Sequence, residues 1–142
     1  MENEKKQILL VDDDEIHLSV AEAILGNEYQ VMSTKSGKEA LDYMMRGPVP
    51  DLVLLDILMP RMDGWETFNR LKAISLLRDV PIAFLTSVDG AAEKIHAQEI
   101  GAADYITKPF EREALLKRVK AIFTSHNVLG IRRFASPNKG FA

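Results

Sequence analysis

The chain of 142 residues contains no cysteine. Disulfide bonds, thiolate metal sites and a cysteine nucleophile are therefore excluded, and the composition is typical of a protein from a reducing compartment such as the cytoplasm. A large excess of charge is also missing, because 18 lysines and arginines stand against 21 aspartates and glutamates. With a net charge of −3, we expect no direct binding to nucleic acid, and any electrostatic function must be local.

Long apolar runs are missing as well. Residues 1–6 are polar, and nothing behind them has the length of a signal peptide or of a membrane span. We therefore expect a soluble cytoplasmic protein with no membrane contact. The hydrophobic share of 46% is sufficient for one continuous core in a chain of this length. We expect a single domain over residues 1–125 and a C-terminal tail or linker over residues 126–142, where helical and strand periodicity is lost.

Five short segments, three of them mainly aliphatic, alternate with stretches of helical periodicity. These segments have the length of buried strands, and they cover residues 8–11, 29–33, 52–55, 82–86 and 104–107. Helices are expected to begin near Asp14, Ser36 and Asp63, the third ending before Asp79, then to cover residues 89–100 and a last segment with Leu115 and Phe123 on one face. This alternation predicts an α/β fold in which a parallel sheet with right-handed crossovers carries helices on both faces.

Four of the expected strands end at polar residues. Asp12, Asp13 and Asp14 follow the first, Asp56 follows the third, Thr86 is the last residue of the fourth, and Lys108 follows the fifth. Open α/β sheets bind ligands beyond the carboxyl ends of their strands, so these side chains are expected to converge at one edge. Neighbouring carboxylates raise one another's pKa and call for a cation. An all-oxygen site with room for water suits Mg²⁺, for which Mn²⁺ can substitute.

Asp56 stands alone at the end of its strand and is the best placed carboxylate to act as a nucleophile toward phosphorus. The product would be an acyl phosphate. Lys108 would supply a positive charge to the phosphoryl oxygens, and the Thr86 hydroxyl would donate a hydrogen bond to one of them. Pro109 allows a cis peptide bond after Lys108, which would redirect the chain at this point.

These residues give the sequence a clear resemblance to the receiver domains of two-component response regulators, in particular the single-domain chemotaxis type. The resemblance covers about residues 6–123 and is carried by Asp12-Asp13, Asp56 with Ile57-Leu58-Met59-Pro60, Asp63-Gly64, Thr86-Ser87, Gly101-Ala102, Tyr105 and Lys108-Pro109-Phe110. It implies a flavodoxin-like three-layer sandwich with five helices and a five-stranded parallel sheet of order 2-1-3-4-5.

The resemblance also implies a role for each matching residue. Asp56 corresponds to the phosphoacceptor, and the Mg²⁺ ligands correspond to Asp13, to Asp12 through water, to Asp56 itself and to the backbone carbonyl of Leu58. Phosphoryl binding and switching are implied for Thr86, Ser87, Lys108 and Tyr105, with Tyr105 turning inward as Thr86 moves. His17, His96 and His126 share no spacing with each other or with a carboxylate that indicates a ligand set, and we expect them to be surface or partly buried residues, none of them a phosphate donor.

A receiver domain implies partners and an output rather than an enzyme of metabolism. The expected donor is a phosphohistidine on a sensor histidine kinase or phosphotransfer protein, and the protein itself would at most catalyse its own phosphorylation and dephosphorylation. The output face implied by the resemblance is formed by the fourth helix, the fifth strand and the fifth helix, and it would bind an unidentified effector or a second copy of the chain. We expect this face to carry Glu93, Lys94, Asp104, Arg112, Lys117 and Arg118.

Three alternatives stay open at this point. A haloacid-dehalogenase-like phosphatase would use Asp12 as its nucleophile, but it would leave Asp56 idle and needs a later acidic pair that the sequence lacks. A degenerate receiver would serve only as a binding module, although every acid, hydroxyl and cation is present. The sequence also does not tell whether the receiver stands alone or comes from a larger regulator or hybrid kinase.

Overall fold

The computed structural model describes residues 4–129. Its strands are β1 (Gln7–Val11), β2 (Gln30–Thr34), β3 (Leu52–Leu55), β4 (Ile82–Thr86) and β5 (Tyr105–Thr107). Its α-helices are α1 (Glu15–Leu25), α2 (Gly37–Arg46), α3 (Gly64–Lys72), α4 (Ala91–Glu99) and α5 (Arg112–Leu129), and a short 3₁₀ helix, η1, covers Ser75–Leu77. Among the residues described, no helix combines the length and the apolar character that crossing a lipid bilayer requires.

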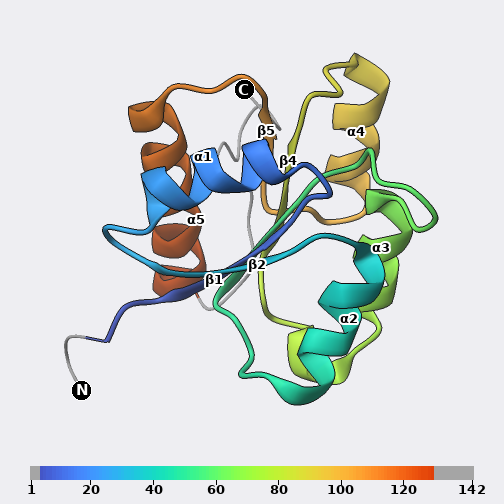
Figure 1. The fold of residues 1–142 in the computed structure, drawn as a ribbon, viewed down its shortest axis with the longest axis horizontal. Helices are drawn as coiled ribbons and strands as arrows, with labels where there is room; N and C mark the ends of the chain where they lie inside the picture. The colour runs from blue at the N-terminus through green and yellow to red at the C-terminus, as the bar shows by residue number, and fades with distance from the viewer. Residues whose placement is uncertain (1–3, 130–142) are drawn as a thin grey trace.

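All strand pairs of the sheet are parallel, and their order is β2-β1-β3-β4-β5. Helices α1 and α5 cover one face, and α2, α3 and α4 cover the other (Figure 1). The strands are apolar on both faces, as expected of a sheet buried between two helical layers. Leu10 and Leu54 point toward α1 and α5, whereas Leu9 and Val53 belong to the cluster under α2, α3 and α4. The predicted three-layer α/β fold is confirmed.

Polar side chains fix the starts of the first two helices where the sequence predicted them. Asp14 caps α1, because its Oδ1 accepts hydrogen bonds from the backbone N–H of Ile16 at 2.9 Å and of His17 at 3.2 Å. Ser36 caps α2 by accepting a hydrogen bond from the N–H of Glu39 at 3.0 Å. These caps attach each helix to the strand end before it, at the edge where the polar residues gather.

Two helices differ from the prediction. Helix α3 ends at Lys72 rather than running to the residues before Asp79, and η1 fills the gap. The Lys72 ammonium donates a hydrogen bond to the Val80 carbonyl at 2.7 Å and so ties the end of α3 to this connection. Helix α5 continues to Leu129 and takes in the first four residues of the expected tail. The domain boundary at residue 125 stays a prediction, and residues 130–142 lie outside the described part of the chain.

Candidate functional site

Three carboxylates meet at the carboxyl end of β1 and β3. Asp12, Asp13 and Asp56 each offer an oxygen, and these oxygens lie within 4.8 Å of one another. The strand register explains why, since Val11 pairs with Leu55 and the Asp56 N–H donates to the Val11 carbonyl at 2.9 Å. Asp12 and Asp56 are each 6% exposed, whereas Asp13 faces solvent. The sheet thus brings together the acidic residues that the sequence predicted at this edge.

The loop between β3 and α3 passes close beneath the phosphoacceptor candidate. The Gly64 N–H donates to the Ile57 carbonyl at 2.8 Å, and a Cβ on Gly64 would lie only 2.2 Å from the carbonyl oxygen of Asp56. The Asp56 side chain is held in turn, because its Oδ1 accepts a hydrogen bond from the Ile57 N–H at 2.8 Å. A residue without a side chain is therefore required at position 64 to keep this loop in place.

Lys108 reaches the acidic cluster from the end of β5. Its ammonium lies 2.5 Å from Asp12 Oδ2 and 3.5 Å from Asp56 Oδ2, and its side chain is 7% exposed. The Lys108 N–H donates to the Thr86 carbonyl at 2.9 Å, which continues the pairing of β4 with β5. The peptide bond between Lys108 and Pro109 is cis. A buried ammonium next to two buried carboxylates is an electrostatic arrangement that can stabilise the negatively charged oxygens of a phosphoryl group.

Burial raises the pKa of Asp56 above its ordinary value, although the Thr86 hydroxyl and the Lys108 ammonium act in the opposite direction. The negative charge of Asp12 raises the pKa of Asp56 further. Both effects disfavour the ionised carboxylate in the absence of additional positive charge. The cluster is therefore a place where a divalent cation would be bound favourably.

Thr86 and Tyr105 lie on neighbouring strands behind this cluster. Thr86 is fully buried, and its Oγ1 accepts a hydrogen bond from the Val88 N–H at 3.3 Å. Tyr105 is 1% exposed, and its hydroxyl donates to the Val88 carbonyl at 2.6 Å. Burial, with smaller effects from nearby acids that include Glu93, raises the pKa of Tyr105 to about 12. Tyr105 thus already points inward in this conformation, and the segment after β4 is bonded to both residues.

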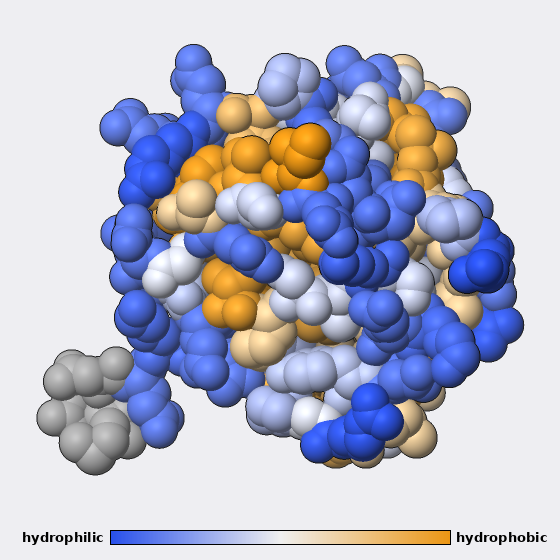
Figure 2. All heavy atoms as spheres, in the orientation of Figure 1, coloured by the Kyte–Doolittle hydropathy of each residue, from blue (hydrophilic) through white to orange (hydrophobic). Residues whose placement is uncertain are grey.

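Exposed residues surround the site on two sides. Ser87 is exposed and lines a cavity of about 330 Å³ together with Lys108. Leu58, which is 59% exposed, lines a second cavity of about 500 Å³ with Val88. In Figure 2, apolar atoms gather over α1, whose exposed residues include Ile16 and Val20. The acidic cluster and Lys108 therefore lie next to exposed apolar side chains.

His17 lies beside Lys108 and Asp12, although its spacing in the sequence indicates no ligand role. Its Nδ1 lies 2.8 Å from the Lys108 ammonium and 3.7 Å from Asp12 Oδ2, and its side chain is 43% exposed. The sequence does contain an indication of this position. His17 follows Asp14 by about one helical turn, so both side chains lie on the face of the helix that is directed toward the acidic run. His96 packs against the Trp65 ring at 4.6 Å, away from the acids, and the side chain of His126 lies outside the described part of the structure.

One residue expected on the output face is not on the surface. Asp104 is fully buried and accepts two hydrogen bonds from Arg118, one from Nε at 2.9 Å and one from Nη2 at 2.5 Å. This pair connects the segment before β5 to α5. The expectation that Asp104 is displayed to a partner is therefore wrong, because its carboxylate is used inside the domain.

Comparisons with known proteins agree on one family. The family model of the response regulator receiver domain matches residues 8–120. The response regulator MprA of Mycolicibacterium vanbaalenii is 39% identical over 82% of this chain and 49% of its own length, and the response regulator PleD of Caulobacter vibrioides is 36% identical over 82% and 26%. The chain thus spans between a quarter and a half of the length of these curated relatives.

Solved structures show the same likeness. A putative response regulator from Chloroflexus aurantiacus is 36% identical, with a TM-score of 0.79 over 85% of this chain and 99% of that one. A chemotaxis protein of Vibrio cholerae is 28% identical, with a TM-score of 0.77 over 82% of this chain and 97% of that one. Neither the family match nor these relatives support the alternative of a haloacid-dehalogenase-like phosphatase with Asp12 as its nucleophile.

Proposed function

This chain belongs to the family of response regulator receiver domains, and on that premise we propose that Asp56 is its phosphoacceptor. The observation that carries the proposal is the position of Asp56 at the end of the central strand β3. There its carboxylate lies close to the oxygens of Asp12 and Asp13, and its Oδ2 is 3.5 Å from the Lys108 ammonium. No other carboxylate among the described residues occupies the end of the middle strand.

The proposed reaction is a phosphoryl transfer onto a carboxylate oxygen. An oxygen of Asp56 forms a bond to the phosphorus of a phosphohistidine, the P–N bond breaks, and the departing imidazole nitrogen keeps the electron pair and takes a proton from water. The product on Asp56 is a mixed anhydride, which hydrolysis returns to the carboxylate. Lys108 pairs with the phosphoryl oxygens, and Thr86 and Ser87 offer hydroxyl groups on the same side.

The donor set fits Mg²⁺, with Mn²⁺ as a substitute. Oxygens of Asp12, Asp13 and Asp56 lie within 4.8 Å of one another, and the loop after β3 adds the backbone carbonyl of Leu58 as a further oxygen donor in our proposal. When bound, the cation would neutralise part of the negative charge of these acids and of the incoming phosphoryl oxygens. Lys108 would then be free to leave Asp12 for the phosphoryl group.

The output would follow from the contacts behind the site. Phosphorylation adds about −1.5 to −2 charge next to Thr86. We infer that Thr86 then leaves the Val88 N–H for the phosphoryl group, and that this rearranges the segment bonded to Tyr105. The face of α4, β5 and α5 would transmit the change to an effector or to a second copy of the chain.

The partners and setting remain part of the same proposal. A sensor histidine kinase or a phosphotransfer protein would supply the phosphoryl group. The protein would act in the cytoplasm as a signalling phosphoacceptor that catalyses at most its own phosphorylation and dephosphorylation. Residues 1–125 would form the receiver and residues 126–142 a tail or linker.

Intact mass spectrometry after treatment with acetyl phosphate tests the acceptor and the cofactor together. The wild-type protein should gain one phosphoryl group when Mg²⁺ is present and none when it is chelated. The Asp56→Asn variant should gain none, and the matched control Asp79→Asn, at an exposed position, should behave as the wild type. Labelling of Asp56→Asn at the wild-type rate would overturn the proposal.

A further inference from the structure

We propose that His17 is a positioning residue for Lys108, and that its Nδ1 fixes the direction in which the ammonium presents its charge to the phosphoryl group. The inference rests on the proposed function, because it concerns the same transfer onto Asp56. The observation behind it is the distance of 2.8 Å between His17 Nδ1 and Lys108 Nζ.

Counting protons on the ammonium determines the role of each partner. A lysine ammonium has three N–H donors and no acceptor. The three polar partners at Lys108 Nζ are Asp12 Oδ2 at 2.5 Å, His17 Nδ1 at 2.8 Å and Asp56 Oδ2 at 3.5 Å. Since the ammonium can only donate, Nδ1 of His17 must accept, and the ring proton then sits on Nε2. Water has little access to this ammonium, because the side chain is 7% exposed.

Two of the three partners of Lys108 change during the proposed reaction, and the third does not. Asp56 becomes the acyl phosphate, and Asp12 is a proposed metal ligand, so both carboxylates change their charge or their bonding. His17 Nδ1 takes part in neither event. It can therefore hold one N–H of the ammonium in place while the other two pass from carboxylate oxygens to phosphoryl oxygens. Without it, the flexible lysine side chain would have to be ordered at the moment of transfer.

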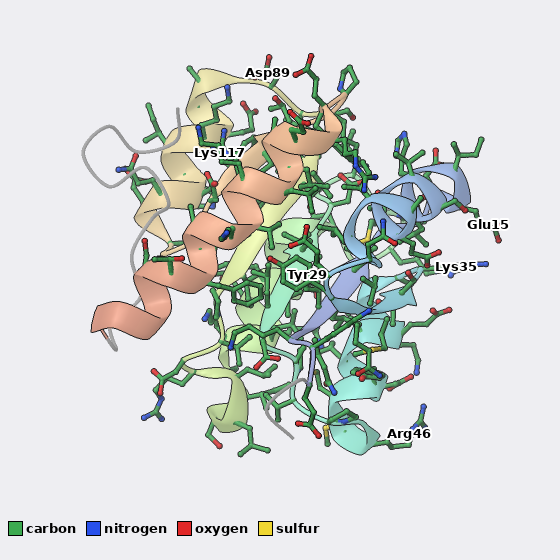
Figure 3. The ribbon with its side chains drawn as sticks, turned by 90° about the vertical axis from the view of Figure 1, so that its left-hand side faces the viewer. Glu15, Tyr29, Lys35, Arg46, Asp89 and Lys117 are labelled. Carbon is green, nitrogen blue, oxygen red and sulfur yellow. The ribbon has the colours of Figure 1, made fainter. Side chains whose placement is uncertain are left out.

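The backbone that carries the imidazole is anchored to the acidic run. His17 lies in the first turn of α1, where its N–H donates to Asp14 Oδ1 at 3.2 Å, and the Asp14 N–H donates to Asp12 Oδ1 at 2.9 Å. The start of α1 is also paired with the segment after β2, since Glu15 and Lys35 form an ion pair and lie side by side in Figure 3. The start of α1 is therefore connected to Asp12, a member of the acidic cluster, through Asp14.

Replacing His17 should leave the fold intact. The apolar core takes Leu18 from this turn, whereas His17 borders the cavity of about 330 Å³ that Ser87 and Phe110 also line. The ring therefore meets open space on one side instead of closely packed neighbours. A loss of phosphorylation in a His17 variant would then report on Lys108 rather than on folding.

Three substitutions separate the hydrogen bond from the shape of the ring. Asparagine places an oxygen acceptor at the branch position of Nδ1, glutamine places it one bond further out, and leucine removes it. We expect His17→Leu to lower the maximal rate of phosphorylation by acetyl phosphate about tenfold, the effect of one hydrogen bond to a charged group. The dissociation constant for Mg²⁺ should stay unchanged. His17→Asn should recover most of the rate, His17→Gln should not, and the control His96→Leu should match the wild type.

A double-mutant comparison tests whether His17 acts through Lys108. In a Lys108→Ala background, His17→Leu should have no further effect on the rate. A wild-type rate in His17→Leu, or the same loss with and without Lys108, would overturn the inference. If the wild-type protein takes up no phosphoryl group at all, the proposed function fails instead.

Nitrogen NMR gives a readout that needs neither phosphorylation nor metal. At a pH where the ring is neutral, the Nδ1 resonance of His17 should shift between the wild type and Lys108→Met, while the His96 ring nitrogens serve as the internal reference and stay in place. An unchanged His17 resonance would show that the hydrogen bond does not exist in solution.

Discussion

At the scale of single residues, Gly64 determines how closely the loop after β3 can approach the backbone of Asp56. An alanine Cβ at this position would lie 2.2 Å from the Asp56 carbonyl oxygen and 2.6 Å from the Ile57 Cα. We expect Gly64→Ala to lower the free energy of unfolding by about 1–3 kcal/mol, the usual cost of overpacking, as measured by urea denaturation. At Gly90 the nearest atom belongs to the flexible Glu93 side chain, so Gly90→Ala is the control and should cost less. Equal losses would contradict the steric argument.

The Tyr105 hydroxyl makes a pH-dependent contribution to stability. Its hydrogen bond to the Val88 carbonyl is worth about 1 kcal/mol, so Tyr105→Phe should be less stable by that amount at neutral pH. Burial raises the pKa of Tyr105 from 10.0 to about 12 in the folded state, so the unfolded chain loses this proton first. The contribution is complete below pH 10.0 and is lost as the pH rises through about 12. The stability difference between wild type and Tyr105→Phe should therefore narrow above pH 10.0 in denaturant titrations; a constant difference would refute this assignment.

At the scale of elements, an ion pair joins Asp104, the residue before β5, to Arg118 on α5. The Asp104 carboxylate is fully buried; it accepts two hydrogen bonds from Arg118 and a third from the Tyr105 N–H at 2.7 Å. Removing the guanidinium leaves a buried carboxylate without its counter-ion, so Arg118→Leu should cost about 3–5 kcal/mol in the free energy of unfolding. The same substitution at the exposed Lys120, on the same helix, should change stability by less than about 0.5 kcal/mol. Similar values for the two variants in denaturant unfolding would show that Asp104 is not dependent on this arginine.

At the scale of the whole molecule, the acidic cluster exists only in the folded state, so a cation that binds there would stabilise the fold. Asp12 and Asp13 are adjacent in the sequence, but Asp56 joins them only when β1 and β3 pair. A ligand that binds the folded state alone stabilises it by about 2.7 kcal/mol at a hundred times its dissociation constant. We therefore expect Mg²⁺ to raise the melting temperature, and chelation to reverse the shift. In Asp13→Asn, whose site is exposed and not part of the core, the shift should shrink; an equal shift in both proteins would argue against this site.

The strands and the helix starts could be predicted because each depends on residues that are close together in the sequence, and the acidic cluster could be predicted because it lies at the ends of those strands. Short apolar runs that end at Asp12, Asp56, Thr86 and Lys108 indicate buried strands whose carboxyl ends carry polar groups. Parallel pairing then brings those ends to one edge, which is how the acidic cluster could be anticipated. The helix caps at Asp14 and Ser36 were equally visible, because a cap depends on neighbours two or three residues away.

Other features depend on contacts between residues that are far apart in the chain, and sequence patterns do not encode those contacts. His17 and Lys108 are separated by 91 positions, yet they are hydrogen-bonded because α1 starts beside the end of β5. The counter-ion of the buried Asp104 is likewise distant in sequence, because Arg118 lies on α5, 14 positions further along the chain. Periodicity and capping act over a few residues and fix the elements and the chemical groups at their ends. Which of those groups touch, and which are removed from the surface, follows from how the layers pack.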